Sequence, residues 1–257
     1  MEKEVRKYYR FDRITDYMLH DLCPGRMSES RYIRNLILED EMHFIGTNVS
    51  HVNNIRVQLA GIFNNVNQAL FVITNGKRNT DILSKEIGAA RDIRKGNGLL
   101  FLYLNGRGDC GEHPIGKQYR FDNKTAEAVK KNFLKLKEAD SKITESRYVR
   151  ELIRREYTDR AGIHPYVISE ISESLTLLGR DINALTKQFN SEDFSYPEVA
   201  RFRSLVEKLV PLKEKFDPEI EKLLFDVKNH PVMYESVADY IKVTGMVRGK
   251  YTGGLRG

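Results

Sequence analysis

The sequence predicts a mainly α-helical protein with a small two-stranded antiparallel β-ribbon, formed within one chain by the two copies of a repeat. The first observation is the repeat itself, which spans a short segment and the two helical segments that follow it. The second is the alternation of apolar and polar residues in the short segment, which is typical of a strand. The third is a composition of 40% hydrophobic and 30% charged residues with only 7 prolines, which indicates a helix-rich globular chain.

The internal repeat consists of two matching blocks. Residues Lys7–Asp12 (KYYRFD) recur as Lys117–Asp122 (KQYRFD), at an offset of 110. Residues Ser28–Ile37 (SESRYIRNLI) recur as Thr144–Ile153 (TESRYVRELI), at an offset of 116. The second copy therefore has six extra residues between its blocks. Self-similarity of this density indicates a duplicated supersecondary unit.

Each copy begins with a predicted strand, Lys7–Phe11 in the first copy and Lys117–Phe121 in the second. Alternation places four aromatic residues on the inward face of these strands, namely Tyr9, Phe11, Tyr119 and Phe121. A lone strand leaves an unpaired edge, and a ribbon needs a second strand. Because the chain carries both strands, we predict that they pair with each other as an intramolecular pseudo-dimer.

Two predicted helices follow each strand. Asp12 and Asp122 are suited to cap the first helix, because a short carboxylate accepts the unpaired amides of its first turn. In the first copy this helix ends at Pro24–Gly25, whereas in the second it runs on through Lys137–Asp140. The second helix of each copy carries one apolar stripe, which indicates a buried face.

The formal net charge of +6 favours an anionic partner. The charge is unevenly distributed, with zero over residues 1–40 and +5 over residues 117–157, where 12 Lys and Arg accompany 7 Asp and Glu. Cys23 and Cys110 have no CxxC neighbourhood, so neither a zinc site nor a disulfide framework is indicated. Because the sequence shows neither a signal peptide nor a membrane-spanning run, we expect a cytoplasmic protein without membrane insertion.

At these residues the chain resembles the ribbon-helix-helix superfamily of DNA-binding proteins, and within it the MobC-like accessory proteins of plasmid and conjugative-element mobilisation. The resemblance covers residues 5–40 and 117–156 and extends into a third helix. There Leu178–Leu185 (LGRDINAL) is similar to an Asn-containing signature of MobC-like proteins, and Asn64–Ala69 aligns with it at the same offset of 116. Phe63 stands where the second copy has Gly179, so the match of the first copy is partial.

The resemblance implies that the ribbon enters the major groove of DNA, where Arg pairs with guanine and Gln with adenine through two hydrogen bonds. The outward strand residues are the candidate base contacts, namely Arg6, Tyr8, Arg10, Gln118 and Arg120. Free amides at the start of each second helix favour an anion. The candidate phosphate contacts there are Ser28, Ser30, Arg31, Thr144, Ser146 and Arg147. Arg34 and Arg150, further along these helices, are predicted to be exposed residues rather than DNA ligands.

The predicted domain organisation follows the repeat. Residues 5–40 and 117–157 together form the DNA-binding unit, residues 41–116 a helical insert, residues 158–247 a C-terminal helical region and residues 248–257 a basic tail. Further helices are expected near residues 48–74, 80–95, 166–190, 197–215 and 218–229. A break is expected at Gly96–Gly98, and the apolar segment Leu99–Leu104 fits either a buried strand or a helix.

The sequence predicts no enzymatic activity, no catalytic residue, no metal and no cofactor. Its 6 histidines are scattered, and no Ser-His-Asp or Cys-His arrangement is evident from spacing. The resemblance implies a relaxosome accessory protein that binds double-stranded DNA at a transfer origin and assists a relaxase. A transcriptional repressor using the same ribbon, and a helical adaptor that binds protein, are the alternatives. The DNA sequence recognised and the oligomeric state stay open, and a homo-oligomer is one possibility.

Overall fold

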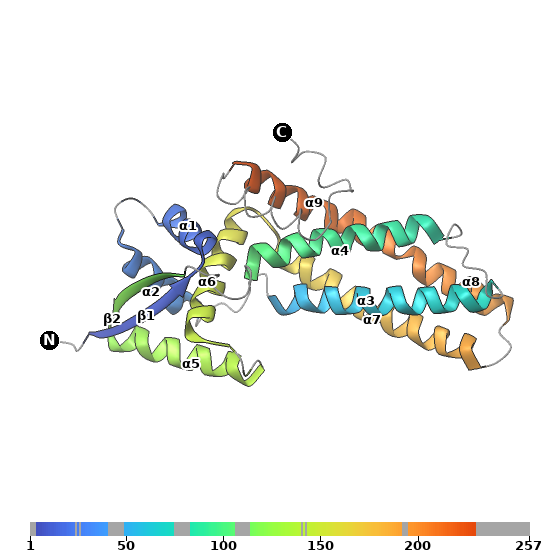
Figure 1. Ribbon diagram of the computed structural model, residues 1–257, viewed down its shortest axis with the longest axis horizontal. Helices are drawn as coiled ribbons and strands as arrows, with labels where there is room; N and C mark the ends of the chain where they lie inside the picture. The colour runs from blue at the N-terminus through green and yellow to red at the C-terminus, as the bar shows by residue number, and fades with distance from the viewer. Residues whose placement is uncertain are drawn as a thin grey trace. The chain divides into compact units, whose positions relative to one another are not determined.

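A computed structural model describes residues 4–23, 25, 27–40, 49–74, 83–105, 114–139, 141, 143–191 and 195–229 (Figure 1). The elements are β1 Val5–Phe11, α1 Arg13–Leu22, α2 Glu29–Asp40, α3 Val49–Ile73, α4 Ser84–Asn105, β2 Ile115–Phe121, α5 Asn123–Ala139, α6 Glu145–Arg160, α7 Pro165–Ser191, α8 Tyr196–Glu207 and α9 Leu209–Asn229. The described chain is mainly helical, and its strands form a two-stranded antiparallel sheet. The predicted fold class is thereby confirmed.

The chain divides into two compact units. The first unit contains both strands and the first two helices of each repeat copy, together with residues 102–105 and 226–229. The second unit contains α3, α7, α8 and the larger parts of α4 and α9. The predicted DNA-binding segments 5–40 and 117–157 both belong to the first unit, whereas the predicted basic tail, 248–257, lies outside the described residues.

The strands β1 and β2 lie side by side (Figure 1). Their register places Tyr8 directly opposite Gln118, at the centre of the ribbon. These two residues are equivalent positions of the repeat, so a local two-fold relation between the strands runs through this pair. Each strand begins two residues before its predicted start, at Val5 and Ile115. The two copies thus complete one ribbon within a single chain, as the sequence predicts.

The inward face of the ribbon is aromatic and buried. Tyr9, Phe11, Tyr119 and Phe121 are each at most 2% exposed. The ring centroids of Tyr9 and Tyr119 lie 6.0 Å apart, and the rings of Tyr119 and Phe121 are stacked. A slip of one residue would turn this whole set toward water, so the aromatic face fixes which side of the ribbon is outward.

Beneath the ribbon, the helices of one copy pack against those of the other. Helix α1 packs on α6, α5 packs on α2, and α2 and α6 pack on each other. Each first helix therefore contacts the second helix of the other copy, and the core of this unit is shared between the copies. The shared core includes Ile33 and Ile37 of α2 and their counterparts Val149 and Ile153 of α6.

The predicted N-caps of the first helices are confirmed. Asp12 Oδ1 accepts a hydrogen bond from the Thr15 N–H at 3.0 Å, and Asp122 Oδ1 accepts one from the Thr125 N–H at 2.7 Å. Helix α1 has 10 residues and α5 has 17, so the extra residues of the second copy lengthen its first helix. The Pro-Gly pair that follows α1 has no counterpart in the second copy.

Helices α3 and α7, the third helices of the two copies, form a long pair in the second unit (Figure 1). Asn54 donates to Ser172 Oγ at 2.8 Å near their starts, and the Thr186 hydroxyl donates to the Asn65 carbonyl at 3.3 Å near their ends, so the helices run parallel. Six buried apolar residues of each helix recur at alternating spacings of three and four, as in a coiled coil. These residues are Val52, Ile55, Leu59, Ile62, Val66 and Ala69 in α3, and Ile168, Ile171, Leu175, Leu178, Ile182 and Leu185 in α7.

The predicted break at Gly96–Gly98 is wrong, because helix α4 continues through these residues. A Cβ atom at Gly96 would lie only 2.8 Å from Cγ1 of Ile220, so the glycine lets α9 approach α4 closely. The buried amide of Asn97 donates to the Val52 carbonyl at 2.9 Å. Long-range packing thus favours a helix where the local sequence favours a break, and Leu99–Leu104 is helical.

The C-terminal helices are divided at a different place from the predicted one. Instead of helices near 197–215 and 218–229, α8 ends at Glu207 and α9 runs through Pro218. A proline inside a helix removes one backbone hydrogen bond. In α9 the buried residues Phe216, Ile220, Leu223 and Val227 continue one apolar stripe across the proline, which compensates for this loss.

Candidate nucleic-acid interface

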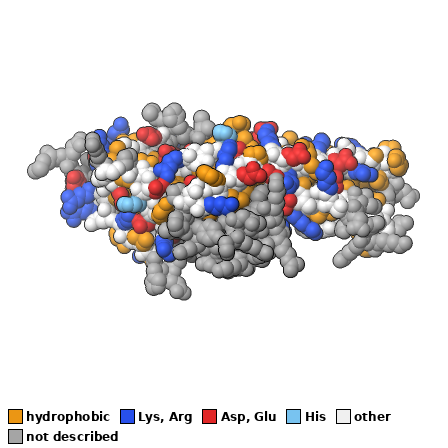
Figure 2. Space-filling view, turned by 90° about the horizontal axis from the view of Figure 1, so that it is seen from above, with side chains coloured by type: hydrophobic (Ala, Val, Ile, Leu, Met, Phe, Trp, Pro, Cys, Tyr) orange, Lys and Arg blue, Asp and Glu red, His pale blue; other side chains and the backbone are white. Residues whose placement is uncertain are grey.

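The outward face of the ribbon brings together all the residues predicted to contact bases. Arg6, Tyr8, Arg10, Gln118 and Arg120 are all exposed, at alternate positions of β1 and β2. Figure 2 shows Lys and Arg side chains grouped at the left of the view, where Figure 1 places the ribbon. The inward aromatic residues anchor the opposite side, so the outward side chains are presented on a fixed backbone.

The register gives the two ends of the outward face different compositions. From one end to the other, the opposing pairs are Arg6 and Arg120, Tyr8 and Gln118, and Arg10 and Gly116. Gly116 is the repeat counterpart of Arg6. One end therefore carries two arginines directly opposite each other, and the other end carries one.

The end formed by Arg6 and Arg120 concentrates positive charge. Side chains directly opposite across a ribbon have Cβ atoms about 4.5–5.5 Å apart, and like charges at these positions destabilise the pairing. Arg120 Nη1 lies 3.8 Å from Glu4 Oε2, with both side chains 64% exposed, so this contact is weak in water. An anionic or hydrogen-bond-accepting ligand would relieve the repulsion between the two arginines.

The end formed by Arg10 and Gly116 carries the aromatic ring of Tyr8. A Cβ atom at Gly116 would lie 1.7 Å from Tyr8 Oη and 2.5 Å from Cζ, so the tyrosine side chain lies across the glycine. The tyrosine is nevertheless 61% exposed, and its free surface faces outward with the arginines. Gly116 therefore determines where this ring lies.

Two ion pairs fasten the ribbon to the second helices, and each joins one copy to the other. Lys7 Nζ lies 2.9 Å from Glu145 Oε2, and Lys117 Nζ lies 2.9 Å from Glu29 Oε1. Lys117 also pairs with Asp16. Although partial burial alone would lower it, the hydrogen bonds to Asp16 and Glu29 raise the pKa of Lys117 above its ordinary value. Both lysines hold the ribbon in place and add little to its outward charge.

Two arginines of the second helices hold the strands by their backbone. Arg150 Nη1 donates to the carbonyl of Arg10 at 3.1 Å, and Arg34 Nη2 donates to the carbonyl of Arg120 at 3.5 Å. The prediction that both are exposed is wrong for Arg150, which is only 8% exposed because the strand of the other copy covers it. Arg34 is half-buried. The backbone at one outward arginine of each strand is thus held by the other copy.

The predicted phosphate contacts lie at the starts of α2 and α6. Ser28 Oγ accepts the Arg31 N–H at 3.3 Å, and Thr144 Oγ1 accepts the Arg147 N–H at 3.2 Å, so both hydroxyl side chains cap their helices. Arg31 is exposed and Ser30 is half-buried. The helix dipole and first-turn amides at such a helix start favour an anion.

In the second copy, two of these residues are engaged within the protein. Ser146 Oγ accepts the backbone N–H of Arg10 at 3.2 Å and so fixes the edge of β1. Arg147 Nε lies 3.2 Å from Glu151 Oε1, one helical turn further along α6. These contacts place the start of α6 directly beside the ribbon, while leaving Arg147 only half-buried.

Arg154 of α6 is an important residue that the sequence interpretation missed. Its guanidinium is 1% exposed, pairs with Asp12 at 2.6 Å and donates to Thr15 Oγ1 at 2.8 Å. It also donates to the carbonyls of Leu102 and Tyr103 near the end of α4, where the helix dipole favours a cation. Although burial alone would raise it, the charge of Arg154 and the hydrogen bonds from Thr15 hold the pKa of Asp12 below its ordinary value.

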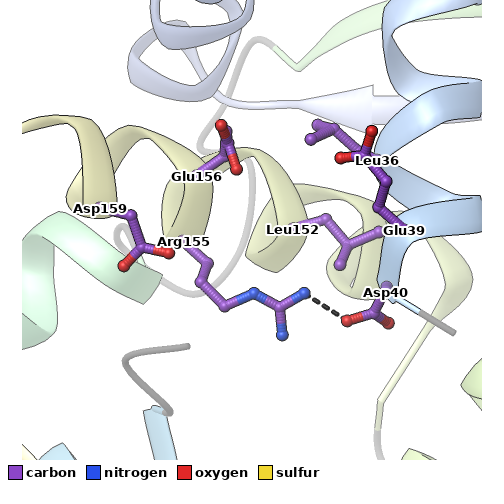
Figure 3. Close-up of a pocket in the computed structure, with 7 residues that line it drawn as sticks. All are labelled: Leu36, Glu39, Asp40, Leu152, Arg155, Glu156 and Asp159. Carbon is purple, nitrogen blue, oxygen red and sulfur yellow. Dashed lines mark hydrogen bonds and ion pairs between the residues drawn. The ribbon is translucent and has the colours of Figure 1, made fainter. Parts of the chain in front are cut away.

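A hollow of about 180 Å³ lies between the last turns of α2 and α6 (Figure 3). Its lining residues are Leu36, Glu39, Asp40, Leu152, Arg155, Glu156 and Asp159. Arg155 forms an ion pair with the buried Asp40. Partial burial and the charge of Glu156 raise the pKa of Asp159 to about 6, against the opposing charge of Arg155. Because carboxylates dominate this hollow, it is unsuited to phosphate.

No group of three or more His, Cys, Asp and Glu side chains able to hold a metal ion occurs among the described residues. Cys110, His43, His113 and His230 lie outside the described part of the chain. No described helix is long and apolar enough to span a membrane.

Comparisons with known proteins give no match to any family model, curated protein or solved structure. The repeat, the geometry of the ribbon and the chemistry of its side chains are therefore what mark the outward face as the candidate site.

Proposed function

We propose that this protein binds double-stranded DNA sequence-specifically, with the ribbon in the major groove. The observation that carries the proposal is the outward face of the ribbon, which exposes three arginines, a glutamine and a tyrosine above a fully buried aromatic face. A two-stranded ribbon fits the major groove, where each base pair presents a distinct pattern of donors and acceptors. Arginine and glutamine are the side chains that read guanine and adenine there through two hydrogen bonds.

The attachment of the ribbon supports this proposal. Ion pairs at Lys7 and Lys117 and backbone contacts from Arg34 and Arg150 hold both strands against the helices. A ligand-binding element that is already ordered loses less conformational entropy when it binds. The starts of α2 and α6 supply amides and the exposed Arg31 as phosphate contacts beside the ribbon.

We further propose that the DNA is a transfer origin and that the protein assists a relaxase as an accessory protein of the relaxosome. This part of the proposal rests on the resemblance to MobC-like proteins, which extends from the ribbon into the third helix. The signature residues Leu178–Leu185 lie in α7, within its parallel pairing with α3. Relaxase chemistry then belongs to the partner, and this chain contributes recognition of the site.

A charge-matched comparison tests the DNA-binding face. One variant combines Arg6→Ala, Arg10→Ala and Arg120→Ala on the ribbon. The control variant combines Arg180→Ala, Arg201→Ala and Arg203→Ala at exposed positions of α7 and α8. Both variants lose the same net charge. Fluorescence anisotropy with a duplex selected by the wild type should show a loss of more than about 100-fold for the ribbon variant. The control should lose only a few-fold, through weaker non-specific attraction. Equal losses in the two variants would refute the proposed face.

A second experiment tests the role at a transfer origin. Genomic fragments of the element that encodes the protein are captured with the purified chain and sequenced. We expect enrichment of the fragment that contains the relaxase nick site, and faster nicking of supercoiled DNA by the relaxase when the protein is added. Enrichment of promoter fragments alone, with nicking unchanged, would favour a repressor instead.

A further inference from the structure

The two ends of the outward face differ because equivalent outward positions of β1 and β2 do not all carry the same residue. Arg10 and Arg120 are equivalent and identical. Tyr8 corresponds to Gln118, and Arg6 corresponds to Gly116. These two differences are therefore the whole departure of the three opposing pairs from two-fold symmetry.

From this arrangement we infer that the protein reads a non-palindromic duplex in one orientation, and that Gly116 is the residue that determines this specificity. The inference rests on the proposed DNA binding and adds the form of the site to it. The ends of the site are distinguished by an arginine pair at one end of the ribbon and by an aromatic ring at the other.

Gly116 acts through its lack of a side chain. The strand pairing brings it opposite Arg10, and Tyr8 occupies the space that a Cβ atom at this position would need. Any other residue at position 116 would push the tyrosine aside, because the Cβ atom would lie 1.7 Å from Oη. Gly116 thus stands where the other copy has an arginine, and it leaves the space that the Tyr8 ring occupies.

The chemistry of the two ends favours different bases. Arg6 and Arg120 together present a dense set of donors, which matches the O6 and N7 acceptors of guanine in the major groove. The exposed ring of Tyr8 presents an apolar surface beside Arg10, and apolar contact in the major groove recognises the C5 methyl group of thymine. A site with guanine at the arginine-pair end and thymine at the tyrosine end fits the ribbon in only one direction.

The main contacts beneath the two ends occur in equivalent pairs, so they do not produce this difference. Lys7 and Lys117 form equivalent ion pairs with Glu145 and Glu29. The backbone contacts from Arg150 and Arg34 are likewise equivalent. A ribbon with two-fold symmetric side chains on this framework is therefore expected to read an inverted repeat.

Selection from a random duplex library tests the inference. The symmetrised variant combines Tyr8→Gln with Gly116→Arg, which gives both strands the outward order Arg, Gln, Arg. A control variant combines Tyr166→Gln with Gly61→Arg, which makes the same chemical changes at exposed positions of α7 and α3. The wild type and the control should select the same non-palindromic site, with guanine and thymine at opposite ends. The symmetrised variant should select an inverted repeat, and its affinity for the wild-type site should fall roughly 5-fold to 150-fold.

The results of the selection distinguish failure of the inference from failure of the proposed function. An inverted repeat selected by the wild type, or the wild-type site retained by the symmetrised variant, would overturn the inference and leave DNA binding intact. If the wild type enriches no duplex, both the proposed function and the inference fail.

The single variant Tyr8→Gln, which introduces no new contact at Gly116, provides a second test. It should lose the thymine preference and keep the guanine end, and an unchanged site would contradict the assigned role of the ring.

Discussion

Lys7 of the first copy pairs with Glu145 of the second, and Lys117 of the second copy pairs with Glu29 of the first. Arg6 of the first copy, in contrast, corresponds to a glycine in the second, Gly116. The comparison of the two copies shows that the lysines, glutamates and arginines that hold the ribbon to the second helices are the same in both, whereas two of the three outward positions of each strand have diverged. Duplication within one chain allows this, because a homodimer has to present the same side chains on both strands.

The copies also differ on the inner side of their second helices. Arg154 of α6 binds Asp12 and the last turn of α4, whereas its counterpart in α2 is Leu38. The second copy therefore provides a polar attachment inside the first unit for which the first copy has no equivalent at this position. The next predictions test these similarities and differences, beginning with this attachment.

Arg154→Leu, which copies the residue of the first repeat, should have the largest effect on stability. It leaves Asp12 partly buried without its cation, and breaking such a pair costs about 3–5 kcal/mol of unfolding free energy. Urea denaturation measures the change. Arg180→Leu, at a side chain that is 73% exposed, is the control and should change stability by less than about 0.5 kcal/mol. A loss below about 1 kcal/mol for Arg154→Leu would show that the buried pair is not a main attachment.

The equivalent arginines Arg10 and Arg120 should each affect one end of the DNA site. Replacing either by alanine should cost about 1–3 kcal/mol of binding free energy for the preferred duplex and relax the base preference at its own end only. Titrations against duplexes substituted at one position at a time measure this. Relaxation at both ends by a single substitution would mean that the two strands are not read independently.

The paired lysines should show a smaller difference between the copies. Lys117→Met should destabilise the protein more than Lys7→Met, by about 0.5 kcal/mol, because Lys117 contacts two carboxylates. Since its folded pKa is raised, the contribution of Lys117 is fully present below the ordinary lysine pKa and is lost as the pH rises through the raised value. Denaturation at neutral pH, and again above pH of about 10.5, tests both points. Equal losses for the two lysines at neutral pH would argue against a role for Asp16.

The smallest expected effect concerns Asp159, in the last turn of α6. Because its pKa is raised to about 6 by partial burial and by Glu156, the fold favours the neutral carboxyl group and is slightly weakened when the group ionises. Asp159→Asn should therefore be slightly more stable than the wild type at pH 7, and the gain should disappear as the pH falls toward about 4. Thermal unfolding at the two pH values measures it, and a variant less stable at pH 7 would show that the carboxylate is favourably paired.

The features that the sequence predicted are those set by local patterns. Alternation around Tyr9 and Tyr119 identified the inward face of the ribbon, and Asp12 and Asp122 identified the helix starts, because strand faces and N-caps depend on residues close together in the chain. The difference at position 116 can also be found from the sequence, since aligning the two copies places Gly116 against Arg6. The effect of this difference depends on the strand register, which places Gly116 opposite Arg10 and beside Tyr8. The sequence alone does not give that register.

The features that the sequence did not predict have partners far away in the chain. Arg150 is predicted to be exposed because charged helical residues usually are, and nothing in the local sequence singles out Arg154, yet these arginines contact backbone carbonyls of β1 and α4 respectively. The sequence at Gly96–Gly98 predicts a break, although Gly96 lies in a helix because α9 packs against it. In each case tertiary packing outweighs a local preference.

Base analogues in the selected duplex can show whether the ribbon reads DNA in the major groove. Replacing guanine by 7-deazaguanine removes the N7 acceptor from the major groove, whereas replacing it by inosine removes the amino group from the minor groove. We expect 7-deazaguanine opposite the Arg6 and Arg120 end to weaken binding roughly 5-fold to 150-fold, and inosine to leave it nearly unchanged. Binding that is sensitive to inosine and indifferent to 7-deazaguanine would show that the ribbon does not read guanine in the major groove.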